Sequence, residues 1–187
     1  QKQAVEHIDG AMLILAGAGS GKTKTITTRL AYLIDEVGIP PSATLTLTFT
    51  NKAAQEMRER ALTLLHNRYE SPPLLCTFHR FGLLFLRFHI TALGRNANFV
   101  VLDTDDKRAI LKSLCKIRPI SQLDYYISDM KNAFLSPEQA QTYAHSEEYK
   151  LMNRIYGEYE NYLLNKNLLD FDDLLYLTYA ILLKNDN

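Results

Sequence analysis

Residues Met12 to Thr28 read Met-Leu-Ile-Leu-Ala-Gly-Ala-Gly-Ser-Gly-Lys-Thr-Lys-Thr-Ile-Thr-Thr, and they are the most informative part of the chain. The run Met12–Leu15 is apolar, as in a short parallel strand that is covered on both faces. The glycines that follow allow a sharp turn and a close approach of a ligand to the backbone. The stretch therefore predicts a strand over 12–16, a phosphate-binding loop, and a helix whose N-terminus favours anions.

Two side chains at the end of this loop have the spacing that nucleotide chemistry requires. Lys22 is placed to reach the β- and γ-phosphates, and the hydroxyl of Thr23 is placed to ligate Mg²⁺. The strict loop pattern has glycine at position 16, where this chain has Ala16, but the remaining glycines and the Gly-Lys-Thr sequence are intact. A glycine-rich turn without a ligand is the alternative interpretation.

The composition is that of a globular protein. The chain has 187 residues, of which 47% are hydrophobic and 22% charged, enough for one core or for a core with a smaller subdomain. No apolar run reaches the roughly 18–20 residues of a membrane helix, and the first ten residues do not resemble a signal peptide. Cys76 and Cys115 lack metal-ligand spacing and are interpreted as reduced thiols. We therefore expect a cytoplasmic protein without membrane contact.

The net charge of zero conceals an asymmetry along the chain. Residues 51–95 carry seven basic and three acidic side chains, whereas residues 96–187 carry ten basic and fourteen acidic ones. A basic central segment indicates a local contact with a polyanion, although solvated helix faces often carry similar imbalances.

Two further strand–helix pairs follow the loop. Thr44–Phe49 alternates with period two and is predicted to be a strand, and a helix is predicted from Asn51. Leu74–Thr77 is predicted to be a third strand, followed by a helix over His79–His89. Three strand–helix pairs in succession indicate an α/β fold with a parallel sheet and helices on its faces.

The chain changes character near residue 94 and becomes mostly helical. The predicted elements are a strand at 98–102 and helices at about 105–116, 120–134, 137 onward, 147–166 and 169–183. In the long helix an apolar and aromatic stripe recurs every three or four residues, which favours a core face over a base-stacking surface. The stripe comprises Tyr149, Met152, Tyr156, Tyr159 and Leu163.

Three aspartates precede the last predicted helix. Asp170, Asp172 and Asp173 lie at its start, where the helix dipole favours negative charge. We interpret them as N-terminal capping residues in preference to a catalytic metal site.

Polar and aromatic residues follow the second and third predicted strands. In an open α/β sheet, ligands bind beyond the carboxyl ends of the strands, where the phosphate-binding loop also lies. Phe49, His79 and Arg80 could there contact a nucleic-acid strand by stacking and by pairing with phosphates. A core position for Phe49, and a capping or core role for His79, are the alternatives.

Together these stretches resemble the N-terminal part of superfamily 1 DNA helicases of the UvrD/Rep/PcrA type. Ala16–Thr23 is similar to the phosphate loop of that family, including its alanine at the first position. Thr48–Arg60 resembles its motif Ia, and Thr77–Phe81 its motif Ib. Gln1–Val5 resembles the end of its glutamine motif, and 170–175 an element near the end of its helical 1B insertion.

The resemblance implies a P-loop NTPase fold. Residues 1–90 would form the N-terminal part of a RecA-like ATP-binding domain 1A, with an incomplete parallel sheet. Residues 91–187 would form the mostly helical subdomain 1B and its return toward 1A.

The resemblance also implies roles for individual residues. Gln1 would read adenine, with Gln3 as the alternative for this role. ATP and Mg²⁺ would be bound by Ala18, Gly19, Ser20, Gly21, Lys22, Thr23 and Lys24, with Thr23 as the Mg²⁺ ligand. Single-stranded DNA would be contacted by Phe49, Thr50, Asn51, Lys52, His79 and Arg80.

The implied function is that of the ATP-binding and DNA-contacting part of a 3′-to-5′ DNA helicase of repair or replication, acting on single-stranded DNA and its junctions with duplex. The motor part of a recombination helicase–nuclease, a small-molecule kinase and a non-enzymatic single-strand binder are the alternatives. The family's acidic Asp-Glu-x-Gln-Asp motif (Walker B) does not occur in the sequence. We therefore expect a fragment that does not hydrolyse ATP alone and that self-associates or rearranges its sheet.

Overall fold

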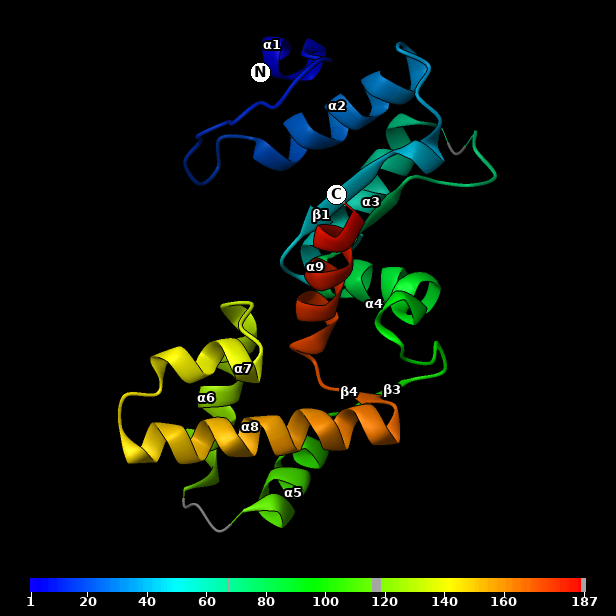
Figure 1. Cartoon of the computed structure of the whole chain (residues 1–187). Coiled ribbons are helices and arrows are strands. Elements are labelled where there is room, and N and C mark those ends of the chain that lie inside the picture. Colours follow the sequence, from blue (N-terminus) through cyan, green and yellow to red (C-terminus); the bar gives the residue numbers. More distant parts are fainter. Residues whose placement is uncertain (67, 116–118, 186–187) are drawn as a thin grey trace. The chain divides into compact units, whose positions relative to one another are not determined.

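The computed structural model describes residues 1–66, 68–115 and 119–185, and it divides into two compact units, Gln1–Phe78 and His79–Asn187 (Figure 1). The division falls before the predicted boundary at residue 90, because the helix that follows Phe78 packs into the core of the second unit. The assignment of the two parts to subdomains 1A and 1B stays a prediction. Among the described residues, no helix has the length and apolar composition needed to cross a membrane.

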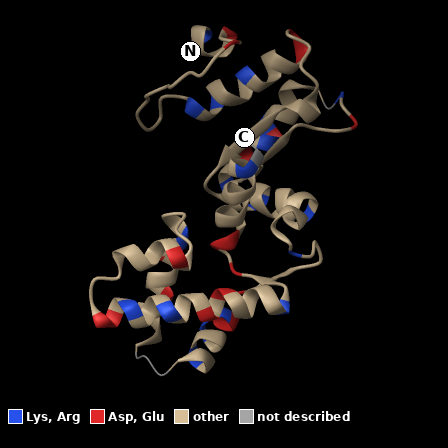
Figure 2. Cartoon of the chain, in the orientation of Figure 1, with Lys and Arg blue, Asp and Glu red and all other residues tan. Residues whose placement is uncertain are grey.

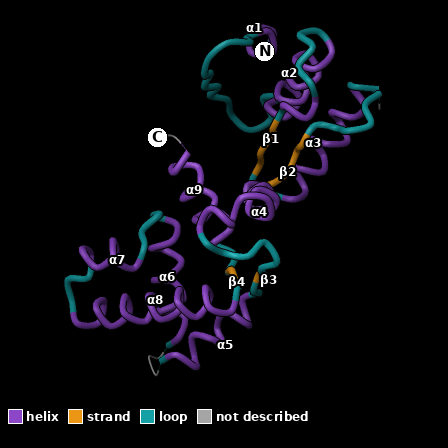
Figure 3. The backbone as a smooth tube through the Cα atoms, turned by 45° about the vertical axis from the view of Figure 1, so that its right-hand side comes forward, coloured by secondary structure: helices purple, strands orange, loops and turns teal. Residues whose placement is uncertain are grey.

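The first unit contains two parallel strands and the helices that follow them. Its elements are α1 (Lys2–Glu6), α2 (Lys22–Asp35), the 3₁₀ turn η1 (Pro41–Ala43), β1 (Leu45–Thr48), α3 (Asn51–Leu64) and β2 (Leu74–Thr77). Strand β1 pairs with β2 in parallel, with Leu45 opposite Leu74 and Thr48 opposite Thr77 (Figure 3). The second and third predicted strands are thereby confirmed, and the small parallel sheet is compatible with an incomplete α/β fold.

The core of the first unit lies between α2, α3 and β2. Side chains that recur every three or four residues on each helix face one another there. The buried members are Leu30, Ile34, Met57, Ala61, Leu65 and Leu75.

The strand predicted at Met12–Ala16 is wrong in this structure. The whole stretch between α1 and α2 is loop (Figure 3), and the side chains of Leu13 and Leu15 are 84% and 87% exposed. A strand is stable only as a member of a hydrogen-bonded ladder, and within the described part of the chain β1 has β2 as its ladder partner and 12–16 has none. This apolar run therefore forms no strand, and its side chains are exposed to solvent.

The second unit is largely helical. Its elements are α4 (Phe78–His89), η2 (Ile90–Leu93), β3 (Val100–Val101), α5 (Thr104–Leu114), α6 (Ile120–Asn132), α7 (Pro137–Ala140), η3 (Gln141–Tyr143), α8 (Glu147–Lys166), β4 (Leu168–Leu169) and α9 (Asp173–Asn185). The last helix begins at Asp173 and not at Leu169, because β4 pairs in parallel with β3. The predicted end of the earlier helix at Lys116 lies outside the described residues.

The predicted core stripe of α8 is confirmed for four of its five positions. Met152, Tyr156, Tyr159 and Leu163 are buried against α5 and α6, whereas Tyr149 near the start of α8 is 48% exposed. Charged residues of both signs cover the remainder of α8, as expected of a solvated face (Figure 2).

A second cluster joins α4 to β4 and α9. Its buried members are Leu86, Ile90, Phe99, Leu169, Leu174, Leu177 and Ile181. Gly82 permits this close packing, because a Cβ at this position would lie 2.3 Å from the carbonyl oxygen of Leu174. The return segment of the chain is thus fixed against α4.

Candidate functional site

The phosphate-binding loop has the backbone conformation that its glycines predict. Gly19 and Gly21 have φ of +74° and +83°, values that residues with a Cβ rarely adopt, and Gly21 is the N-cap of α2. A Cβ at Gly17 or Gly19 would meet no atom within 4 Å, so the inner face of the loop is open. An open loop at a helix N-terminus fits a phosphate group.

Lys22 extends back over this loop. Its Nζ donates hydrogen bonds to the carbonyl oxygens of Ala16 and Gly17, at 2.9 Å and 2.8 Å. The ammonium group therefore lies across the mouth of the loop, where phosphate oxygens could replace the two carbonyls as acceptors. With Lys24 and Arg29, it makes the first part of α2 basic (Figure 2).

Gln1, the residue predicted to read adenine, lies beside the loop. Its Nε2 donates to the carbonyl oxygen of Ser20 at 3.0 Å, and α1 is attached to α2 by a 2.8 Å hydrogen bond from Arg29 Nη1 to the carbonyl oxygen of Ala4. The pocket next to them has a volume of about 150 Å³. Its lining is formed by Gln1, Ala4, Ile14, Ala16, Ser20, Lys22, Thr25 and Ile26. Apolar side chains beside one amide suit a flat base with a polar edge.

The other residues predicted to bind the nucleotide lie at the start of α2. Thr23 lies in the first turn, and its carbonyl oxygen accepts a hydrogen bond from Thr27 Oγ1 at 2.9 Å. The side chain of Lys24 is exposed. In the described part of the chain, no group of three or more His, Cys, Asp or Glu side chains is arranged to hold a metal.

Phe49 is on the surface and not in the core. Its side chain is 87% exposed, and its ring contacts that of Phe78 with centroids 5.2 Å apart. The two rings meet because Phe49 follows β1 and Phe78 follows β2, and these parallel strands end in register. Thr50 Oγ1 accepts a hydrogen bond from the Ala53 amide and so caps α3, while Asn51 and Lys52 are exposed.

His79 begins the second unit, and it stacks on an aromatic residue that the sequence interpretation missed. The rings of His79 and Phe171 are 4.0 Å apart and inclined by 15°, and Phe171 is 56% exposed. Burial lowers the pKa of His79, and the nearby Asp172 carboxylate partly offsets this effect. Arg80 follows with an exposed side chain. Phe49 and His79 thus each belong to an aromatic pair, the first in the first unit and the second in the second unit.

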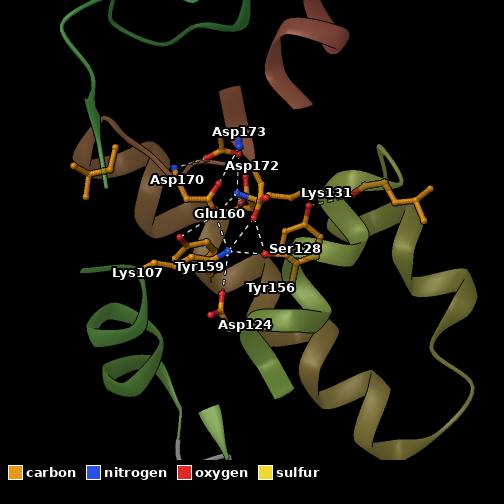
Figure 4. A network of polar contacts seen from close by, with 12 residues as sticks. Lys107, Asp124, Ser128, Lys131, Tyr156, Tyr159, Glu160, Asp170, Asp172 and Asp173 are labelled. Atoms are coloured by element: carbon orange, nitrogen blue, oxygen red, sulfur yellow. Dashed lines mark hydrogen bonds and ion pairs between the residues drawn. The ribbon is translucent and has the colours of Figure 1, made fainter. Parts of the chain in front are cut away.

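A buried ionic network flanks Phe171 (Figure 4). Lys131 on α6 is fully buried, and its Nζ lies 2.7 Å from Asp173, 3.0 Å from Asp170 and 2.7 Å from Glu160. The hydroxyl of Tyr159 also donates to Asp170, at 3.1 Å. One ammonium group therefore joins α6 and α8 to the return segment.

Lys107 on α5 extends the network to Asp172, the residue directly after Phe171. Its Nζ lies 3.1 Å from Asp172 and 3.1 Å from Asp124, and it donates to Ser128 Oγ at 2.9 Å. Ser128 in turn donates to Asp172 at 2.6 Å. Lys107 and Lys131 are both close to Asp170, at 3.5 Å and 3.0 Å, so the two halves share one carboxylate.

Because these charges interact, the carboxyl groups of Asp170 and Asp173 have very different pKa values. Burial raises the pKa of Asp170, but Lys131 and Lys107 outweigh this effect and lower it to about 2. Burial and the neighbouring Asp170 charge raise the pKa of Asp173 to about 8 against the attraction of Lys131. Burial lowers the pKa of Lys131, and the surrounding carboxylates outweigh it and raise that pKa well above its usual value.

The predicted capping role is confirmed for Asp170. Its carboxylate accepts the amide N–H of Asp173 at 2.9 Å, and the Asp173 carboxylate accepts the amide N–H of Asp170 at 2.9 Å. The lysine partners were not predicted. The sequence does contain an indication that Lys131 is buried. Lys131 follows Leu123 and Ile127 at intervals of four residues, so it lies on the same face of α6, and all three side chains are buried.

Comparisons with known proteins identify the family of this chain. A family model described as the UvrD/REP helicase N-terminal domain matches residues 1–187. The ATP-dependent DNA helicase Rep of Buchnera aphidicola (subspecies Acyrthosiphon pisum) is 43% identical over 100% of this chain and 30% of its own length. Rep of Escherichia coli K12 is 40% identical over 100% of the chain and 28% of its length. PcrA of Bacillus subtilis 168 is 37% identical over 95% of the chain and 25% of its length.

The chain therefore spans about a third or less of the length of these relatives. The phosphate loop, the aromatic strand ends and the match over residues 1–187 lead to one conclusion. The chain belongs to the family of UvrD/REP helicase N-terminal domains.

Proposed function

We propose that this chain is the ATP-binding and single-stranded-DNA-contacting part of a P-loop, ATP-dependent DNA helicase. The observation that carries the proposal is the arrangement around the open loop, with Lys22 across its mouth and Gln1 beside it. The Rep and PcrA relatives favour this function over the motor part of a recombination helicase–nuclease. A 3′-to-5′ polarity, a role in repair or replication, and a cytoplasmic location are parts of the same proposal.

Different residues of the loop would bind different parts of a nucleoside triphosphate. The amides of Ala18, Gly19, Ser20 and Gly21 bind phosphate oxygens, and Lys22 balances the charge of the β- and γ-phosphates. ATP would supply the transferable phosphoryl group, and Mg²⁺ at the Thr23 hydroxyl would neutralise the charge that develops on it.

The base and the sugar would lie toward α1. Gln1 presents its amide to the base, and Lys24 adds positive charge beside the phosphates. Because Arg29 ties α1 to α2, the position of Gln1 relative to the loop is fixed. The sequence has no Asp-Glu-x-Gln-Asp motif, so residues 1–187 alone would bind nucleotide weakly and would not hydrolyse it.

Single-stranded DNA would bind to exposed aromatic and basic residues. Stacking on an aromatic side chain is worth about 1–3 kcal/mol per base and tolerates any sequence. Phe49 provides such a surface in the first unit, and His79 with Phe171 in the second. Basic and polar contacts to the backbone would come from Thr50, Asn51, Lys52 and Arg80. Junctions with duplex DNA are the proposed further substrate.

The proposal is tested by ATP turnover of the complete protein with and without single-stranded oligo(dT). We expect DNA to stimulate turnover, and Lys22→Ala to lower it by orders of magnitude, whereas Lys112→Ala on α5 leaves it unchanged. Turnover that oligo(dT) does not change would favour a small-molecule kinase. Near-normal turnover of the Lys22 variant would exclude this loop as the nucleotide site.

A further inference from the structure

The return segment Asp170–Asp173 has an unusual combination of buried and exposed side chains. Asp170 and Asp173 are 1% and 0% exposed, whereas Phe171 between them is 56% exposed and stacks on His79. Figure 4 shows the carboxylates of this segment turned toward Lys107 and Lys131. The backbone on both sides of Phe171 is therefore attached to the helices below it.

We propose that Lys107 and Lys131 are positioning residues that hold Phe171 against His79 in an orientation ready for stacking with a nucleic-acid base. The inference rests on the proposed function, because it assumes that the His79–Phe171 pair contacts single-stranded DNA. Neither lysine touches the DNA in this proposal. Both act through the aspartates beside Phe171.

The geometry assigns different tasks to the two lysines. Lys131 fixes the carboxylates of Asp170 and Asp173. Each of these carboxylates accepts a hydrogen bond from the backbone amide of the other residue, and the two bonds close the turn that contains Phe171. Lys107 and Ser128 fix Asp172, the residue directly after Phe171. A ring held at both neighbours loses little conformational freedom when a base stacks on it, which favours binding.

Lys107 also influences the chemistry of His79. Asp172 is the carboxylate that raises the pKa of His79 against the effect of burial, and Lys107 binds this same carboxylate at 3.1 Å. Loss of the Lys107 charge leaves the Asp172 carboxylate uncompensated beside His79, which would raise the pKa of His79. This pKa therefore reports the loss of the Lys107–Asp172 pair independently of DNA binding.

Lys107→Met is the informative variant. The pocket of about 350 Å³ beside Lys107 is lined by Asp124, Ser128 and Asp172 among others, so water can enter and solvate the carboxylates that lose their cation. Lys131 is fully buried and its loss threatens the fold itself. The matched control is Arg108→Met, which removes one positive charge from the same helix and the same Asp124 without touching the return segment.

The experiment measures binding of fluorescently labelled oligo(dT) to the complete protein, together with the pKa of His79 by NMR. We expect Lys107→Met to weaken binding about tenfold and to raise the pKa of His79, and Arg108→Met to change binding less than twofold. In a protein that already carries Phe171→Ala, Lys107→Met should have no further effect, because it acts through that ring.

The outcomes distinguish the positioning role of Lys107 from the DNA-contacting role of the His79–Phe171 pair. If Phe171→Ala weakens binding and Lys107→Met does not, the positioning role is wrong and the DNA-contacting role of Phe171 stands. If Phe171→Ala and His79→Ala both bind normally, the DNA-contacting role of the pair is wrong, and the positioning role is wrong with it. Equal, additive losses from Lys107→Met with and without Phe171 would show that Lys107 acts by charge alone.

Discussion

Lys131→Met should destabilise the second unit strongly while leaving the first unit intact. Lys131 is fully buried, and its ammonium group is within 3.0 Å of three carboxylates, those of Asp170, Asp173 and Glu160. Methionine has nearly the same length and volume, so the cavity left by the substitution is small. The remaining effect is electrostatic, because the fully buried carboxylate of Asp170, which stays ionised, loses the nearer of its two lysine partners.

Removal of one partner from a buried ion pair costs about 3–5 kcal/mol. For amides of α6 and α8 that exchange only by unfolding of the unit, this corresponds to hydrogen exchange that is about two to four orders of magnitude faster. The matched control is Arg154→Met, because Arg154 pairs with Glu158 at 3.7 Å on α8 but is 70% exposed. This variant should lose at most about 1 kcal/mol.

Neutralising the aspartates tests the electrostatic explanation directly. Replacing both Asp170 and Asp173 by asparagine in the Lys131→Met protein removes the charge of Asp170 and the ionisable carboxyl of Asp173, and it keeps side chains that can accept the capping hydrogen bonds. Most of the lost stability should return, since a buried ionic cluster is often no more stable than a neutral one of equal volume. Hydrogen exchange of the Lys131 variant within tenfold of the original protein, or no recovery in the triple variant, would refute the reasoning.

Three further predictions concern single positions. Phe49→Ala in the complete protein should weaken binding of oligo(dT) by roughly ten- to a hundredfold at constant salt, as expected for one lost stack, and unchanged binding would remove Phe49 from the DNA surface. Gly82→Ala should destabilise the second unit by at least about 1–3 kcal/mol in urea unfolding, because the new Cβ would overlap the carbonyl group of Leu174. The control is Gly157→Ala, which should be neutral or stabilising because the nearest atom to its Cβ would lie at 3.7 Å. The contribution of Asp173 to stability should fall as the pH rises from about 4 to about 8, because folded Asp173 keeps its proton up to a pKa of about 8 whereas the unfolded carboxyl is ionised above about 4, and Asp173→Asn should abolish this slope.

Much of the site could be predicted from local patterns. The Gly-Ser-Gly-Lys-Thr sequence implied a loop whose glycines need positive φ, and Gly19 and Gly21 have it. The three- and four-residue spacing of Met152, Tyr156, Tyr159 and Leu163 implied a buried helix face, which is present. These features depend on residues close together in the chain, whose conformational preferences act without a distant partner.

Other features depended on partners far away in the sequence. The segments Thr44–Phe49 and Leu74–Thr77 contain two strands that pair with each other. The equally apolar Met12–Ala16 has no ladder neighbour among the residues that the structure describes, and it is loop. Apolar composition alone does not make a strand, because its backbone groups need hydrogen-bond partners. Phe49 lies on the surface, directly after the last residue of β1.

The sequence by itself determined the family, the phosphate-binding loop and the helical nature of the second half, since each is written in short patterns or local spacing. Only the tertiary structure decided that Lys107 and Lys131 are buried and that Phe171 stacks on His79. A lysine is ordinarily exposed, and its burial becomes favourable only where folding brings carboxylates from distant segments around it, as Glu160, Asp170 and Asp173 surround Lys131.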